Sequence, residues 1–120
     1  MSSLSLIYLG SVLPMKMTNA SVAIAVALMR RPRNEHWGYD LTKETGVRSG
    51  VLYPILARML DQGWLEDGWE DIATVRENRP PRRYYVLTNE GMRQLGAMAT
   101  AAASDLRFTR SVLPGMQVTV

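Results

Sequence analysis

The feature that most constrains the fold is a pair of amphipathic segments separated by only two residues. Residues 37–46 (WGYDLTKETG) have the composition of a short helix, and Gly46 suits the left-handed position that ends many helices. Residues 49–62 carry a second helical stripe, with apolar side chains at i, i+3 and i+4 spacing. The residues predicted to face inward are Tyr39, Leu41 and Thr45 in the first helix and Leu52, Ile55, Leu56, Met59 and Leu60 in the second.

The second helix also has visible boundaries, since Ser49 can cap its start and Gly63 can end it. Two helices joined by so short a turn predict a helix-turn-helix. Pro54 lies near the start and removes an N–H that would bond to residue 50. We expect either that Pro54 makes the first turn irregular, leaving the amides of residues 49–52 free for an anion and using Gly50 to avoid a clash, or that it only marks the start.

The flanking segments complete a winged helix-turn-helix. Residues 18–31 begin with a capping residue, Thr18 or Asn19, and continue with a run that is apolar on nearly all sides, as in a helix buried between others. Residues 64–69 and 84–87 are typical of two strands, and the polar linker between them suits the tip of a β-hairpin. The predicted fold class is therefore mainly α with a small β-hairpin.

A further helix follows the hairpin and carries a long apolar stripe. The stripe consists of Met92, Leu95, Met98, Ala99, Ala102 and Leu106. Because the globular part already has three helices and a hairpin, we expect this helix to pack against a second copy of the chain; packing on its own domain is the alternative. The predicted organisation is an N-terminal extension (1–17), a winged helix-turn-helix domain (18–88), a C-terminal dimerisation helix (89–110) and a tail (111–120).

Composition excludes several classes of protein. A chain of 120 residues fits one domain. With no cysteine and one histidine, it has no disulfide, thiolate metal site or multi-histidine metal site. No nucleophile–base pair or phosphate loop is present, so we expect neither an enzyme nor a cofactor. The apolar N-terminus lacks the basic region of a signal peptide and the length of a membrane span, which predicts a soluble protein with no membrane partner. The absence of cysteine fits a cytoplasmic bacterial protein.

The charge distribution predicts one basic face. The net charge is +3, but residues 61–71 hold five acidic residues and no basic one. Residues 30–58 and 76–93 each carry a surplus of three basic residues on either side of this acidic block. Such a pattern suits contact with nucleic acid. The alternatives are ordinary surface solvation and neutralisation of the acidic block by the arginines that follow it.

Three motifs together resemble those of the PadR (phenolic acid decarboxylase repressor) family of bacterial transcriptional regulators. They are WGYDLTKETG, SGVLYPILARMLDQGWLE and RRYYVLTNEG, in this order, and the resemblance covers roughly residues 20–95. It implies homodimers that bind an operator through the helix-turn-helix and the wing, and a repressor that a small aromatic or drug-like ligand releases. Some members bind ligands in a pore lined by a tryptophan of the C-terminal helix, whereas this chain has no tryptophan beyond Trp69.

The candidate DNA contacts follow from position in the predicted fold. Base and backbone contacts of helix-turn-helix proteins concentrate at the turn that enters the second helix, and tyrosine hydroxyls nearby can reach a phosphate unless the rings are buried. Arginines of the wing can bind phosphates or enter the minor groove. The candidates are Tyr39, Arg48, Ser49, Gly50, Tyr53 and Arg58 in the helices and Arg76, Arg79, Arg82 and Arg83 in the wing.

Four apolar side chains are candidates for an effector site, namely Trp64, Trp69, Met92 and Met98. Methionines adapt to varied apolar ligands, although packing of the hairpin on the helices is the alternative role of all four. Together with the resemblance, the sequence predicts a dimeric, sequence-specific repressor of transcription whose operator is an inverted repeat in double-stranded DNA. The alternative is a winged-helix module for protein–protein contact.

Overall fold

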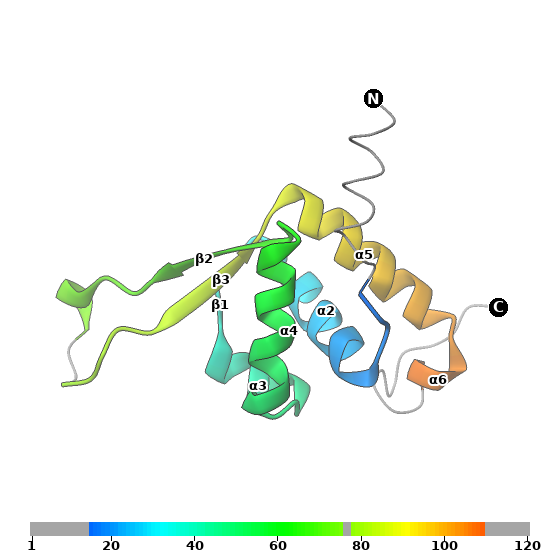
Figure 1. The fold of residues 1–120 in the computed structure, drawn as a ribbon, viewed down its shortest axis with the longest axis horizontal. Coiled ribbons are helices and arrows are strands. Elements are labelled where there is room, and N and C mark those ends of the chain that lie inside the picture. The colour runs from blue at the N-terminus through cyan, green and yellow to red at the C-terminus, as the bar shows by residue number, and fades with distance from the viewer. Residues whose placement is uncertain (1–14, 76–77, 110–120) are drawn as a thin grey trace.

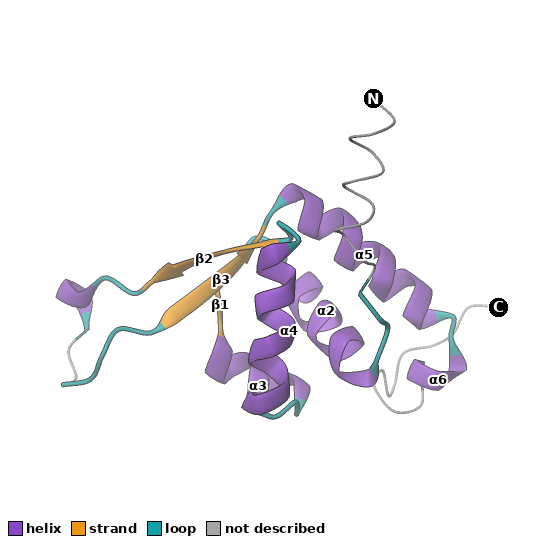
Figure 2. Cartoon of the chain, viewed as in Figure 1, coloured by secondary structure: helices purple, strands orange, loops and turns teal. Residues whose placement is uncertain are grey.

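The elements of the chain follow the predicted order, with three helices before the hairpin and helical structure after it (Figures 1 and 2). The structure is a computed structural model that describes residues 15–75 and 78–109. Arg76, one of the wing candidates, lies outside the described residues. The elements are α2 (Asn19–Arg30), β1 (His36–Trp37), α3 (Gly38–Thr45), α4 (Ser49–Asp61), β2 (Leu65–Trp69), the short 3₁₀ helix η1 (Ile72–Thr74), β3 (Arg83–Leu87), α5 (Asn89–Ala103) and α6 (Leu106–Thr109).

Helix α2 is the centre of the fold, because α3, α4 and α5 all contact it. Its start is fixed by a capping box, in which the Ser21 amide donates to Thr18 Oγ1 (3.1 Å) and the Thr18 amide donates to Ser21 Oγ (2.8 Å). Every residue from Ile24 to Leu28 is buried, so side chains on all faces of the helix enter the core. The prediction of a helix buried between others is confirmed.

The helix-turn-helix is formed by α3 and α4. Gly46 ends α3 with a φ of 73°, and its amide donates to the Thr42 carbonyl at 2.9 Å, as the sequence predicted. Gly63, with a φ of 75°, likewise follows the end of α4. The predicted cap at Ser49 is wrong: Arg48 occupies the N-cap position with no side-chain hydrogen bond, and Ser49 is the first residue of the helix.

Pro54 lies inside a continuous α4, so the prediction of an irregular first turn is wrong. The amides of Val51 and Leu52 both donate to the Arg48 carbonyl, at 2.9 and 2.8 Å, and are not available to a ligand. A Cβ added at Gly50 would meet nothing within 4 Å, so this glycine does not relieve a clash with the proline. Pro54 removes only the helical bond that its N–H would have donated to the Gly50 carbonyl, and the bonds on either side keep α4 continuous.

The wing belongs to a three-stranded sheet rather than to the predicted two-stranded hairpin. Strands β2 and β3 pair antiparallel from Leu65 opposite Leu87 to Trp69 opposite Arg83. Strand β1 pairs with the other edge of β3, which places His36 opposite Tyr85. Two residues of strand are too few to show a periodic pattern, which is why the sequence did not reveal β1.

The C-terminal helix is interrupted, and its apolar stripe is occupied within the chain. Helix α5 ends at Ala103, and α6 begins at Leu106, whose side chain is 66% exposed. Leu95, Met98 and Ala102 are buried, and α5 packs along α2 (Figure 1). The expectation that this stripe has no partner within the chain is therefore wrong, since the long apolar α2 needs a second layer to cover it.

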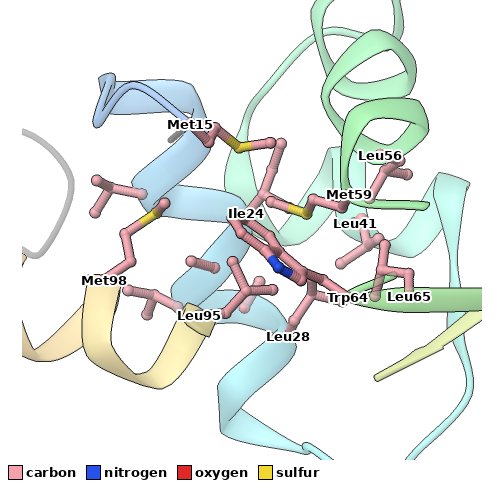
Figure 3. Close-up of a cluster of buried hydrophobic side chains, with 14 of the residues drawn as sticks. Met15, Ile24, Leu28, Leu41, Leu56, Met59, Trp64, Leu65, Leu95 and Met98 are labelled. Atoms are coloured by element: carbon pink, nitrogen blue, oxygen red, sulfur yellow. The ribbon is translucent and has the colours of Figure 1, made fainter. Parts of the chain in front are cut away.

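One hydrophobic core joins α2, α3, α4, β2, β3, α5 and α6 (Figure 3). Trp64 lies in the middle of the cluster and is 8% exposed. Met15 is also 8% exposed, so the chain contributes to the core before the predicted domain start at residue 18. Within the described residues, no helix is long and apolar enough to cross a membrane.

Helix α5 approaches the backbone of Trp64 so closely that only glycine fits at residue 91. A Cβ added at Gly91 would overlap the Trp64 carbonyl oxygen and lie 2.8 Å from its carbonyl carbon. We expect Gly91→Ala to lower the free energy of unfolding by about 2–3 kcal/mol, because backbone cannot move aside as a side-chain tip can. Gly96→Ala, on the same helix, adds only an ordinary contact at 3.4 Å to Met29 and should cost nothing. Urea unfolding of both variants checks this, and equal stabilities would contradict it.

His36, the only histidine of the chain, makes stability depend on pH. Its Nε2 donates to the Arg31 carbonyl at 2.9 Å, and burial lowers the pKa of the ring below 6.5 although this hydrogen bond raises it. As pH falls below about 6.5, His36 of the unfolded chain therefore binds a proton, whereas His36 of the native state stays neutral. The free energy of unfolding then decreases with pH until the pKa of the native state is reached. We expect thermal unfolding between pH 7.5 and pH 5.5 to show this loss and His36→Gln to reduce it. The same loss in His36→Gln would assign it to other groups.

Candidate nucleic-acid interface

Helix α4 presents one side to the core and the opposite side to solvent. Its buried residues are Leu52, Leu56 and Met59, whereas Gly50, Tyr53, Pro54, Ala57 and Arg58 are exposed at the complementary helical spacing. All six candidates that the sequence placed on the helix-turn-helix are exposed. We call them the reading face; they are Tyr39, Arg48, Ser49, Gly50, Tyr53 and Arg58.

Tyr39 lies on the solvent side of α3 and is 60% exposed, so the prediction that it faces inward is wrong. Leu41 is the residue of this helix that enters the core. The ammonium group of Lys43 lies 5.0 Å from the centre of the Tyr39 ring, a cation–π contact. Lys43 is a basic residue of this region that the sequence analysis did not include among the candidates.

Tyr53 is held at the boundary between the two helices. Its ring lies against Gly38, the first residue of α3, and 44% of the residue remains exposed. Gly38 and Tyr39 belong to the motif WGYDLTKETG, one of the three that resemble the PadR family. This motif does not reveal that Gly38 makes room for an aromatic ring from the next helix. The contact brings Tyr53 beside the start of α3, where Tyr39 also lies.

Arg48 borders a surface hollow of about 340 Å³ between the α3–α4 turn and the start of α2. Asn19, Ala20 and Ala23 of α2 line this hollow together with Val51. No pattern in the sequence connects the first turn of α2 with the reading face. Among the described residues, the side chains of Arg48 and Arg58 make no ion pair, so both charges are available to a ligand.

Two of the three described wing arginines are neutralised within the hairpin. Arg79 donates to both carboxylate oxygens of Glu70, at 2.7 and 3.2 Å, and this pairing lowers the pKa of Glu70. Arg83 Nε donates to Asp67 at 2.6 Å, and this bond raises the pKa of the guanidinium. The predicted alternative, that arginines neutralise the acidic block, is confirmed for these two. In the described part of the wing, Arg82 is exposed and its side chain makes no such bond.

Arg83 also stacks on aromatic rings. Its guanidinium lies 5.3 Å from the centre of the Tyr85 ring and 6.0 Å from that of Trp69. Tyr85 is 2% exposed, and burial raises the pKa of its hydroxyl, with Arg83 acting in the opposite direction and Tyr53 in the same direction. Arg83 is therefore held beside one acidic and two aromatic side chains, although its side chain remains 41% exposed.

The four candidates for an effector site lie in different places. Trp64 and Met98 line the same apolar pocket, which has a volume of about 260 Å³. Trp69 is 63% exposed at the far end of β2 and borders a separate hollow beside Trp37 and Tyr84. Met92 packs against the core and does not line the pocket. The other residues that line it are Met15, Met17, Gln94, Ala97 and Ala101, none of which was predicted.

Solved structures share this fold. A regulator of the PadR family from Eggerthella lenta is 25% identical, with a TM-score of 0.55 over 83% of this chain and 80% of the other. A PadR-family regulator from Clostridium difficile is 20% identical, with a TM-score of 0.59 over 81% of this chain and 100% of the other. A third structure, BpsR from Bordetella bronchiseptica, whose DNA binding is regulated by 6-hydroxynicotinic acid, is 19% identical, with a TM-score of 0.59 over 97% and 80% of the two chains.

The comparison with curated proteins found no match. The solved structures under 25% identity support the fold alone. The sequence itself matches the model of the transcriptional regulator PadR-like family over residues 27–97, a range that runs from α2 through the helix-turn-helix and the wing into α5. This match spans more than half of the chain and includes the reading face. The chain therefore belongs to the PadR-like family of transcriptional regulators.

Proposed function

We propose that the protein is a homodimeric, sequence-specific repressor that binds double-stranded DNA through the reading face, in the cytoplasm of a bacterial cell. The observation that carries this proposal is the exposure of Arg48, Tyr53 and Arg58, none of them in an ion pair within the described residues, at a helix-turn-helix. Side chains at the start of the second helix are those that reach base edges in such folds. The charge of Arg48 and Arg58 suits the phosphates that flank those bases.

The start of α4 has the chemistry of a phosphate contact. The amides of Ser49 and Gly50 have no partner among the described residues, and no acidic residue lies in this first turn. The positive end of the helix dipole favours an anion at this point. Because a Cβ at Gly50 would point into open space, the glycine also leaves room for close approach of a phosphate to the backbone.

The wing contributes one strong candidate, Arg82. Since Arg79 and Arg83 are paired with Glu70 and Asp67, their charges attract DNA less than the sequence suggests. The carboxylates of β2 and of the residues that follow it repel phosphates. We infer that the wing approaches the DNA backbone from the side of Arg82, and that α4 carries most of the binding.

The homodimer requires a surface other than the buried stripe of α5. Helices α5 and α6 lie on the opposite side of the molecule from the wing (Figure 1). Ala97, Thr100, Ala101 and Leu106 are exposed on these helices. We propose that a second copy packs here, which leaves both reading faces free. Two reading faces related by a two-fold axis then bind half-sites about one helical turn apart, roughly 10 base pairs.

An effector would act through the pocket that Trp64 and Met98 line. We propose an uncharged aromatic ligand, because the walls are apolar and Gln94 supplies the one polar side chain among the lining residues. Trp64 lies three residues after the end of α4, and its amide donates to the Met59 carbonyl at 2.9 Å. A ligand that displaces the Trp64 ring would therefore strain the end of α4 and weaken DNA binding.

DNA binding is tested by replacing Arg48 and Arg82 together with Ala. We expect weaker binding to all DNA sequences and a salt dependence of log affinity that is flatter by roughly 1 unit per lost phosphate contact. Fluorescence anisotropy with the upstream region of the protein's own gene, at several salt concentrations, measures both quantities. Arg93→Ala is the matched control, because Arg93 lies on α5 and pairs with Glu90.

The same DNA separates the regulator from the alternative, a winged-helix module for protein–protein contact. A footprint with two-fold symmetry supports a dimeric regulator. Absence of any binding at low salt would favour the interaction module, and an unchanged salt slope in the double variant would remove Arg48 and Arg82 from the interface.

The effector site is tested with 2-naphthol as a probe. Binding should change the tryptophan fluorescence and release the operator, since Trp64 lines the pocket. Ala97→Leu should weaken both effects because it fills the pocket, whereas Thr100→Leu, which changes the same proposed dimer surface without lining the pocket, should not. Equal effects of 2-naphthol on the two variants would place the ligand elsewhere.

A further inference from the structure

The contact between Gly38 and Tyr53 joins a side chain of α4 to the first residue of α3. A Cβ added at Gly38 would overlap the Tyr53 hydroxyl oxygen and lie 2.8 Å from Cζ and 2.9 Å from Cε1 of the ring. Real Cβ atoms do not approach an aromatic ring so closely, so any other residue at this position would have to push the ring away. The position of the hydroxyl end of the Tyr53 ring thus depends on the absence of a side chain at residue 38.

A side chain at residue 38 would meet a movable ring, whereas a side chain at residue 91 would meet the backbone of Trp64. Tyr53 is 44% exposed, so its ring can swing towards solvent without moving the backbone. Gly38 is buried at the first turn of α3 and is not in the left-handed region of backbone space. An alanine here therefore suits the helix and displaces only the tyrosine.

Tyr53 is also connected to the wing. Gly38, which contacts its ring, directly follows β1, and β1 pairs with β3 so that His36 lies opposite Tyr85. Tyr85 in turn carries the guanidinium of Arg83 on its ring, and Arg83 bonds to Asp67 of β2. The contacts therefore run from Tyr53 to Gly38, and from the adjoining β1 to both strands of the wing.

We propose that Gly38 is a positioning residue for DNA reading, which leaves the space in which Tyr53 is held with its ring against the start of α3 and its hydroxyl at the reading face. Gly38 itself is buried and does not contact DNA. This inference rests on the proposed function, because it concerns how the reading face is set before DNA arrives. A tyrosine fixed in this way loses little side-chain freedom on binding, which favours affinity.

The test is a double-mutant cycle between Gly38→Ala and Tyr53→Ala on the full chain. Gly38→Ala should keep its melting temperature but bind the operator about tenfold more weakly, the usual effect of one lost hydrogen bond to a charged group. In the Tyr53→Ala background, Gly38→Ala should cause no further loss, since no ring remains to be displaced. Tyr53→Phe should lose a similar factor while keeping the ring in place.

Two further measurements complete the design. The NMR signals of the Tyr53 ring should shift in Gly38→Ala but not in Gly96→Ala, a matched substitution on α5 that meets only Met29. A Gly38→Ala protein with wild-type affinity, or with the same loss in both backgrounds, would overturn the positioning role alone. A wild-type protein that binds no DNA would instead overturn the proposed function, and with it the role of Gly38 in reading.

Discussion

The junction at Trp64 is the contact on which the rest of the molecule depends. The Trp64 amide bonds to the end of the reading helix, its carbonyl accepts a hydrogen bond from the Thr88 amide at 3.1 Å, and Gly91 packs directly on that carbonyl. The indole ring fills the middle of the core (Figure 3). One residue therefore fixes where α4 ends, where the wing begins and how α5 crosses α2. A substitution in the core at Trp64 would therefore also move the end of α4.

Most of the described charges of the wing are paired with one another within the hairpin, and few are left to attract DNA. The acidic β2 arm and the basic β3 arm pair across the hairpin, which leaves Arg82 as the described wing arginine with an available charge. Such exposed pairs add little stability one by one, but together with the stacking of Arg83 on Tyr85 they hold a long hairpin in one orientation. The positive field at the reading face then comes mainly from α4 and the turn before it.

Much of this fold was predictable because its signals are local. The ends of α2, α3 and α4 depend on Thr18, Gly46 and Gly63, whose capping chemistry involves only near neighbours. The exposure of Arg48 and Arg58 likewise follows from the helical spacing of the buried residues of α4. The pairing of Arg79 and Arg83 was predicted only as an alternative, since it depends on the register of two strands. Strand β1 and the covering of α5 by α2 involve residues far apart in the chain, and no local pattern reveals them.

The sequence by itself determined the order of the elements, the family and the helix that presents basic side chains, because periodicity and capping act over a few residues. Only the tertiary structure decided which of those side chains remain available. It paired Arg79 and Arg83, separated Trp69 from Trp64, and brought Tyr53 of one helix onto Gly38 of another. The physical reason is that steric fit and ion pairing depend on how helices and strands pack against one another. That packing brings together residues that are far apart in the sequence, so no local pattern reveals it.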